Sequence, residues 1–270
     1  MLGRKKRLGF TAISDAMAAQ DGGWLAPIPD GWRQGRTAYG GLTTGLAFTA
    51  ASRTFPDLPP LRSANINFIG PISGDPVFTA QLLRKGRNVT TVKVAGHLDD
   101  AVIADIVFTY GQSRKSIIRV DQSAPPPPPP DRCKSFTPKL AEPIVPNFFL
   151  RFETKLIAGA RPMAGANEGY IRAWSRHKDP ASRKGVAALL TLSDVLPPAA
   201  LSMVRKIAPV SSVNFLLNLV TDTPTTQDGW WQVETRLTTA RDGYSSQIMK
   251  IYNSENELVA EGMQCVTVFA

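Results

Sequence analysis

The hydrophobic positions of the chain form two apolar helical runs, one in each half. Residues 39–55 are rich in glycine, alanine and threonine, and no residue between positions 40 and 52 is charged. We expect this helix to be buried, because a surface helix would have one charged face. The second run, residues 184–203, contains one carboxylate, Asp194, shortly before two prolines. A carboxylate in such surroundings must be exposed to water, paired with another group, or part of a functional site, since burying a charge without compensation costs free energy.

Segments with the pattern of β-strands follow each helical run. They are enriched in β-branched and aromatic residues, alternate in part between apolar and polar positions, and are separated by turns of glycine, asparagine and aspartate. In the first half they occupy residues 62–72 and 76–111, and in the second half residues 209–220 and 229–269. This pattern predicts antiparallel strands joined by tight turns.

The two halves therefore have the same order of elements. The tripeptides "INF" at residues 66–68 and "VNF" at residues 213–215 match, 147 positions apart. We interpret the series as an internal duplication. The predicted fold class is α+β, in which each half contributes one long helix wrapped by an antiparallel sheet.

A proline run separates the halves. Residues 123–131 read "SAPPPPPPD", and six consecutive prolines favour a stiff polyproline II spacer. We place the domain boundaries at residues 1–122 for the first half, 123–146 for a Pro-rich linker, and 147–270 for the second half.

Composition limits the class of partner. The 270 residues have a formal net charge of +9, spread over several basic clusters rather than gathered on one element beside aromatic residues. Nucleic-acid binding favours a concentrated basic surface, so we do not expect a nucleic-acid partner. A scattered positive charge suits a phosphorylated metabolite such as a nucleotide-bearing coenzyme.

Cysteine content and hydropathy bear on the compartment. The two cysteines, Cys133 and Cys265, form no CxxC pair and indicate neither a disulfide framework nor a metal site. No stretch approaches the length of apolar sequence that spans a membrane, and the basic start at residues 1–10 precedes no apolar signal region. We expect a cytoplasmic protein without stable membrane insertion.

Four segments are similar to those of a known family. The first half contains "GRTAYGGLTTGLAFTAA" and "LRKGRNVTTVKVAG", and the second contains "LSD" at residues 192–194 and "ELVAEGMQ" at residues 257–264. Together the chain resembles the acyl-CoA thioesterase II (TesB-like) family from about residue 35 to its C-terminus. The resemblance implies a double hotdog fold, two tandem helix-wrapped antiparallel sheets in one chain, and a homodimer as the expected assembly.

The resemblance also implies an activity and a set of site residues. Members hydrolyse acyl-CoA to the free acid and CoA, without a cofactor or metal, through a water oriented by an aspartate, a serine or threonine, and a glutamine. Asp194 and Gln264 occupy the matching aspartate and glutamine positions. The position of the family's hydroxyl falls near Ala208, which has none, so the nearby Ser212 and Ser211 are the candidates. Ser212 is preferred because it shares strand parity with position 208.

Five further residues are expected to bind the substrate, and they lie in the two first-half segments: Tyr39, Gly40, Gly41, Arg87 and Asn88. The glycines open the first helix, where free backbone N–H groups can stabilise an oxyanion. Apolar surroundings would raise the pKa of Asp194 toward that of a general base at neutral pH. Gln264 can accept from one water hydrogen and donate to a neighbour.

Two alternatives to a thioesterase stay open on the sequence. One is a catalytically silent protein that binds acyl-CoA or lipid on the same scaffold, which the missing hydroxyl at position 208 favours. The other is a different hotdog enzyme such as a dehydratase, which would use His97 or His177. The chain contains no GxSxG motif, and its two histidines make a Ser-His-Asp triad a poor explanation.

Overall fold

The computed structural model describes residues 8–120, 123 and 125–269. The basic N-terminal segment lies largely in residues 1–7, which are outside the described residues. Residues 121–122, at the expected domain boundary, are also outside them.

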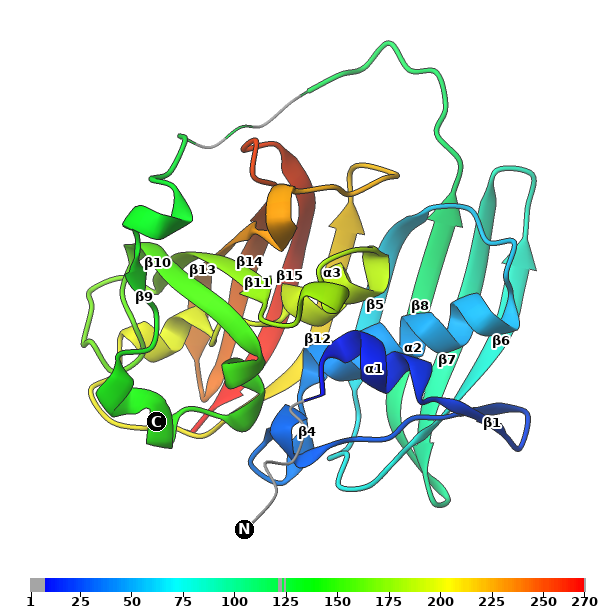
Figure 1. Ribbon diagram of the computed structural model, residues 1–270, viewed down its shortest axis with the longest axis horizontal. Coiled ribbons are helices and arrows are strands. Elements are labelled where there is room, and N and C mark those ends of the chain that lie inside the picture. The colour runs from blue at the N-terminus through cyan, green and yellow to red at the C-terminus, as the bar shows by residue number, and fades with distance from the viewer. Residues whose placement is uncertain (1–7, 121–122, 124, 270) are drawn as a thin grey trace.

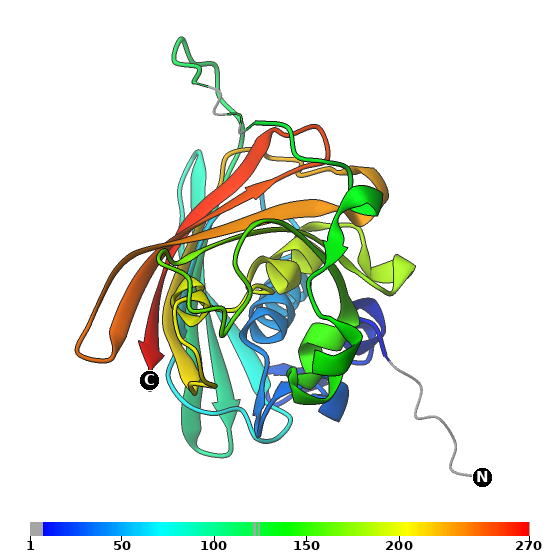
Figure 2. The ribbon, with the colours of Figure 1, turned by 90° about the vertical axis from the view of Figure 1, so that its left-hand side faces the viewer.

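Within the described residues, thirteen strands form one antiparallel sheet that curves around a central pair of helices (Figures 1 and 2). The first half contributes β1 (Ala18–Gln20), β2 (Gly23–Leu25), β5 (Leu61–Phe68), β6 (Val77–Lys85), β7 (Val89–Leu98) and β8 (Ala101–Gly111). The second half contributes β9 (Lys134–Ser135), β10 (Phe152–Gly159), β11 (Tyr170–His177), β12 (Val210–Leu219), β13 (Trp231–Arg241), β14 (Tyr244–Tyr252) and β15 (Leu258–Val268). β3 (Arg33–Gln34) and β4 (Thr37–Ala38) pair separately.

The helices are α1 (Phe10–Asp15), α2 (Gly40–Thr54) and α3 (Val186–Ser193). Short 3-10 turns connect the larger elements: η1 (Asp30–Trp32), η2 (Pro130–Arg132), η3 (Lys139–Ile144), η4 (Asn147–Arg151), η5 (Pro180–Ser182), η6 (Ala199–Ser202) and η7 (Gln227–Gly229).

Read outward from the centre, the two sides of the sheet have equivalent strand orders, except that β9 has no counterpart among the described residues of the first half. The full order runs β1-β2-β6-β7-β8-β5-β12-β15-β14-β13-β11-β10-β9, so β5 and β12 are the central pair. In that pair Asn67 lies directly opposite Asn214. These are the central residues of the two matching tripeptides. A residue of an antiparallel pair faces its own equivalent only where a pseudo-twofold axis passes between the strands, so the axis lies between Asn67 and Asn214. The register agrees with the duplication inferred from the sequence, and the α+β double hotdog class is confirmed.

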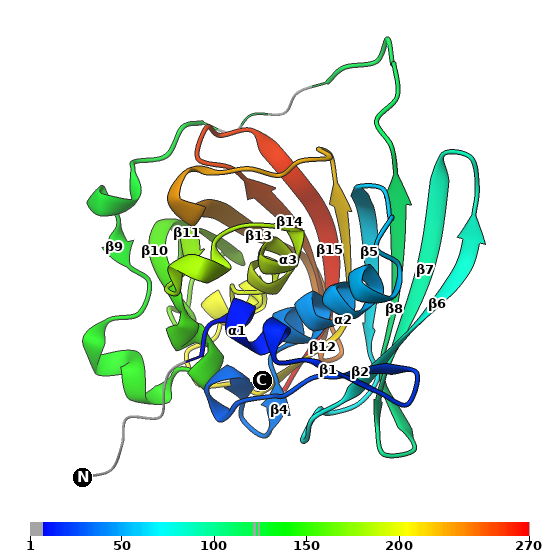
Figure 3. The same cartoon turned by 45° about the vertical axis from the view of Figure 1, so that its right-hand side comes forward.

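Helix α2 is buried, as its lack of charge predicts. Leu42, Leu46 and Ala50 are fully buried under the curved sheet, and α3 packs beside α2 inside the concave face (Figure 3). Small residues on α2 permit this close approach of the two helices.

The expectation of a long second helix over residues 184–203 is wrong. α3 ends at Ser193, and Asp194 is its C-cap rather than a residue within it. Pro197 cannot donate a backbone hydrogen bond, and its ring would clash with the carbonyl four residues earlier, so the helix cannot continue through it. After Pro197 and Pro198 the chain forms only the short turn η6.

Part of the expected linker, residues 123–146, packs on the second half. β9 pairs with β10, and Phe136 is buried. Within the proline run, Nε1 of Trp174 donates to the carbonyl of Pro128 over 2.9 Å, and the guanidinium of Arg172 donates to the carbonyl of Pro125 over 3.4 Å. Carbonyls three residues apart point the same way in a polyproline II helix. The proline run is thus held against β11 of the second half, and residues 112–120, which precede it, carry the chain across from β8 (Figure 1).

Candidate active site

Three polar side chains from separate elements meet where α2 begins and α3 ends. Nε2 of Gln264, on β15, donates to Oδ1 of Asp194 over 3.0 Å and to Oγ of Ser212, on β12, over 2.9 Å. A primary amide has two N–H hydrogens, so these two bonds use both of them. Gln264 therefore ties the carboxylate and the hydroxyl to each other.

A β-bulge decides which serine faces the carboxylate. The register of β12 with β15 shifts between Ser212 and Asn214. Without a bulge, Ser212 and the buried Phe215, three residues apart, would point to opposite faces of the sheet. The extra residue turns Ser212 to the same concave face as Phe215. Ser211 is exposed and does not join the cluster.

The parity argument from position 208 selected Ser212 for the wrong reason. Ala208 precedes β12, which begins at Val210, so alternation along the strand does not extend to it. The bulge, which depends on pairing between strands, determines the direction of Ser212.

Asp194 lies in an environment that favours its neutral form. Burial raises the pKa of its carboxyl to about 7, although hydrogen bonds from Gln264 and from the backbone N–H of Gly41 favour the charged form. The neighbouring Val195 and Leu196 are buried, whereas Asp194 itself keeps partial exposure. A carboxylate with this pKa is a stronger base than an ordinary aspartate and is still about half ionised at neutral pH.

The glycines that open α2 allow it to approach Asp194. A Cβ on Gly40 would lie 2.7 Å from Oδ2 of Asp194, and one on Gly41 would lie 2.3 Å from the carbonyl oxygen of Thr191. The N-terminus of α2 also supplies the Gly41 N–H to the carboxylate, where the partial positive charge of a helix N-terminus favours an anion. Because that N–H is engaged, the expected oxyanion role of Gly41 has no free donor there.

Tyr39 is a packing residue in this structure. It is 1% exposed, its hydroxyl donates to the carbonyl of Thr191 over 2.9 Å, and its ring stacks on Phe148 with centroids 4.0 Å apart. It therefore holds α2 against α3 instead of offering its hydroxyl to a substrate.

Arg87 and Asn88 lie at the opposite end of the first half's sheet from Asp194. They form the β6–β7 turn. The adjoining Val89 pairs with Gly111 on β8, and the preceding residue of β8, Tyr110, pairs with Leu61 at the start of β5. Asn67 pairs with Asn214, which is two residues from Ser212. Asn67 lies six residues beyond Leu61 on β5, about 20 Å away. The structure does not bring these two residues to the cluster, and their role in substrate binding stays a prediction.

One residue of the cluster went unnoticed in the sequence. Gln247, on β14, donates from Nε2 to Oε1 of Gln264 over 2.7 Å and is 1% exposed. Residues 245, 247, 249 and 251 form the inward face of β14, so a glutamine within that apolar alternation was the available signal. Oε1 of Gln264 accepts one hydrogen bond from Gln247, and an amide oxygen has two lone pairs, so the acceptance of a water hydrogen by Gln264 stays a prediction.

Neither histidine lies in the cluster. His177 is buried, its Nε2 bonds the carbonyl of Ala188 over 2.9 Å, and burial lowers its pKa to about 4. His97 lies on β7 opposite Val77. The dehydratase alternative, which required a catalytic histidine, therefore has no support in the site.

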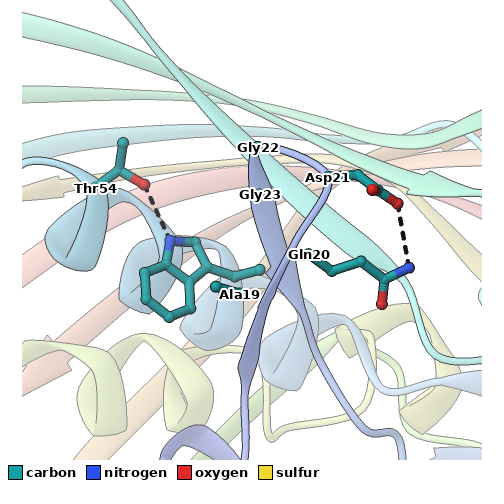
Figure 4. A pocket seen from close by; sticks show the side chains of 7 residues that line it. Ala19, Gln20, Asp21, Gly22, Gly23 and Thr54 are labelled. Atoms are coloured by element: carbon teal, nitrogen blue, oxygen red, sulfur yellow. Dashed lines mark hydrogen bonds between the residues drawn. The ribbon is translucent and has the colours of Figure 1, made fainter.

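A surface hollow of about 420 Å³ lies at the other end of α2 (Figure 4). Residues 19–24 and Thr54 line it, and Nε1 of Trp24 donates to Oγ1 of Thr54 over 3.1 Å. Thr54 and Gly40 are fourteen positions apart on this helix, which corresponds to about 21 Å. This hollow is thus remote from Asp194.

Two domain models match the sequence and together span most of it. The acyl-CoA thioesterase N-terminal domain matches residues 28–111, and the acyl-CoA thioesterase C-terminal domain matches residues 121–268. The chain belongs to the acyl-CoA thioesterase family. It is a TesB-like thioester hydrolase, which confirms the family resemblance. A search of curated proteins found no significant match.

Solved structures share the fold of this acyl-CoA thioesterase at low identity. A hot dog fold protein from Alicyclobacillus acidocaldarius superposes with a TM-score of 0.84 at 20% identity, covering 97% of this chain and 98% of that one. The acyl-CoA thioesterase II TesB2 from Mycobacterium marinum has a TM-score of 0.73 at 19% identity, with 96% and 98% covered. The tesB protein of Mycobacterium avium subs paratuberculosis has a TM-score of 0.76 at 16% identity, with 96% and 97% covered.

The described residues of the thioesterase contain neither a candidate metal centre nor a candidate membrane-spanning helix. No group of three or more His, Cys, Asp or Glu side chains in them is arranged to hold a metal ion. Among the helices of the same residues, none combines the length and the hydropathy needed to cross a membrane.

Proposed function

We propose that this enzyme hydrolyses acyl-CoA to a free acid and CoA by activating a water between Asp194 and Ser212, with Gln264 orienting both. The observation that carries the proposal is the pair of hydrogen bonds from one amide to the carboxylate and to the hydroxyl. The net charge of +9 suits an anionic substrate.

In the proposed reaction Asp194 is the general base. The oxygen of the water forms a bond to the thioester carbonyl carbon while one of its protons passes to the carboxylate. The tetrahedral intermediate then breaks its C–S bond, and the proton held by Asp194 passes to the departing thiolate. A pKa of about 7 supports both transfers at neutral pH, since the group can take a proton and give it back.

Ser212 is proposed to orient the water. Its oxygen accepts from Gln264, so its own O–H is free to donate. A donor on one side of the water and a basic carboxylate on the other point a lone pair of the water in a fixed direction. Holding a reactant in this way lowers the entropic part of the barrier.

The test is a thiol-release assay on purified enzyme with acyl-CoA substrates of several chain lengths. Asp194→Asn and Gln264→Ala are expected to lower kcat by about 10²-fold or more, with thermal unfolding used to verify the fold of each variant. Full activity in both variants would refute the assignment of the site.

The neighbouring serines provide a matched pair for the third residue. Ser212→Ala is expected to lower kcat by about tenfold or more, whereas Ser211→Ala, one position away on the same strand and pointing to solvent, should retain wild-type activity. If the two variants lose equal activity, the bulge does not select the functional hydroxyl.

The homodimer and the cytoplasmic location stay predictions. Light scattering of the purified enzyme measures the mass of the assembly and tests the first of them.

A further inference from the structure

Two glutamines are buried side by side behind the carboxylate and the serine. Gln247 on β14 lies directly opposite Gln264 on β15, and the two side chains are 1% and 2% exposed. Buried amides are costly unless their N–H and C=O groups are paired. The pairing of these two amides has only one consistent direction.

A backbone N–H fixes the donor-to-acceptor direction of this pairing. Ala199 donates from its backbone nitrogen to Oε1 of Gln247 over 2.8 Å, and a backbone N–H cannot accept. The Gln247 amide must therefore present its oxygen to Ala199 and its NH2 group to Gln264. Oε1 of Gln264 accepts that bond, so the NH2 group of Gln264 must face Asp194 and Ser212.

The turn that follows Asp194 supplies this N–H. Ala199 is the first residue of η6, after its N-cap Pro198, and the first N–H groups of a helical turn have no partner within it. The proline pair that stops the helix thus also leaves a buried donor available to Gln247. Ala199 and Asp194 therefore lie five positions apart on one short segment.

We infer that Gln247 is a positioning residue, which locks the amide of Gln264 with its NH2 group toward Asp194 and Ser212. No side-chain atom of Gln247 needs to touch the substrate, because it acts through Gln264. The inference rests on the proposed function for its effect on catalysis, but the hydrogen-bond direction itself does not depend on the activity. Groups that orient a residue of a reactive site typically change activity by about 10–100-fold when removed.

The diagnostic variant is Gln247→Glu. The glutamate side chain has nearly the same shape, and Ala199 can still donate to one of its oxygens. As a carboxylate its other oxygen faces Oε1 of Gln264, so Gln264 must turn its NH2 group away from Asp194 and Ser212. When protonated, the glutamic acid has an O–H that can donate to Gln264 and restore the original direction.

The expected result is a pH-dependent loss. The ratio of the kcat of Gln247→Glu to that of the wild type should fall by about tenfold or more as the pH rises and the glutamate ionises, with little change in KM. Gln247→Met, which cannot ionise, should give a ratio that is reduced but does not fall as the pH rises. Gln81→Glu adds the same charge at an exposed position of β6 and is expected to leave the ratio near one.

A second measurement does not require activity. NMR titration of carboxyl carbons labelled in aspartate reports the pKa of Asp194 in the wild type and in Gln247→Met. Loss of an oriented donor should raise this pKa further, because the Gln264 hydrogen bond favours the charged form.

The outcomes separate the two proposals. If the wild-type chain releases thiol from none of the acyl-CoA substrates, the proposed function fails, while the NMR titration still decides the role of Gln247. An unchanged pKa of Asp194 in Gln247→Met, or equal and pH-independent kcat ratios for the Glu and Met variants, would overturn the inference.

Discussion

Replacing Asp194 by asparagine is expected to remove a cost in stability that grows with pH. Burial raises the pKa of this carboxyl from 3.8 to about 7 in the folded chain. Folding therefore favours the protonated form, so the folded state binds more protons than the unfolded state between these two values. Stability from this group is fully present at about pH 3 and decreases as the pH rises toward 7.

The size of this effect follows from the two pKa values. A tenfold change in proton affinity corresponds to about 1.4 kcal/mol, and the affinity differs by about three such factors, so the free energy of unfolding falls by about 4 kcal/mol between pH 3 and pH 8. This is a substantial share of the 5–15 kcal/mol, roughly, that stabilises a typical protein. The asparagine variant has no such titration.

The assay is urea unfolding of the wild type and Asp194→Asn at several values between pH 4 and pH 8. The asparagine loses one good hydrogen bond, because its NH2 group must face either Gln264 or the Gly41 N–H. That loss is a constant offset of about 1–3 kcal/mol, whereas the titration of Asp194 changes the difference between the two proteins with pH. Across this range the free energy of unfolding of the variant should rise by about 3–4 kcal/mol relative to that of the wild type.

Asp100→Asn, in the exposed β7–β8 turn, measures the effect of removing one acidic charge in general. Two parallel curves for the wild type and Asp194→Asn would refute the reasoning, since they would mean that the carboxyl titrates alike in both states.

Three further predictions concern the same region. The kcat for thioester hydrolysis should rise with pH and level off above about 7, because ionised Asp194 is the proposed base; a rate that is flat from pH 5 to pH 8 would exclude it as the titrating base. Gly41→Ala should lower the stability by about 1–3 kcal/mol, since the added Cβ would lie 2.3 Å from the Thr191 carbonyl; an unchanged Tm would contradict this close contact. Tyr39→Phe should cost about 1–2 kcal/mol by leaving that buried carbonyl without the donor it has at 2.9 Å, as urea unfolding can measure, and a neutral effect would show that the bond contributes nothing.

Local patterns in the sequence were sufficient for most of the framework. Uncharged small residues indicated that α2 is buried, and alternation with glycine and aspartate turns predicted β5 to β8 and β12 to β15. The repeat at a spacing of 147 residues indicated the duplication, whereas the pairing of the two repeats, with Asn67 opposite Asn214, is seen only in the structure. The hairpins that precede the two helices, β1 with β2 before α2 and β10 with β11 before α3, were missed.

The direction of the polar side chains could not be derived from local pattern. The parity rule for Ser212 assumed an uninterrupted strand, and the bulge that turns Ser212 inward arises from the pairing of β12 with β15. The role of Tyr39 in joining α2 to α3 depends on a carbonyl 152 positions away in the sequence.

The sequence by itself determined the fold class, the duplication, and the residue types available for the site, because periodicity, turn residues and burial preferences act over a few neighbouring positions. The tertiary structure alone decided what those residues can do. It provides the burial that raises the pKa of Asp194, the bulge that aims Ser212, and the donor at Ala199 that orients Gln247 and then Gln264. The reason is physical: proton affinity and hydrogen-bond direction depend on which groups are adjacent in space. These groups come from five separate elements of the second half and the start of α2.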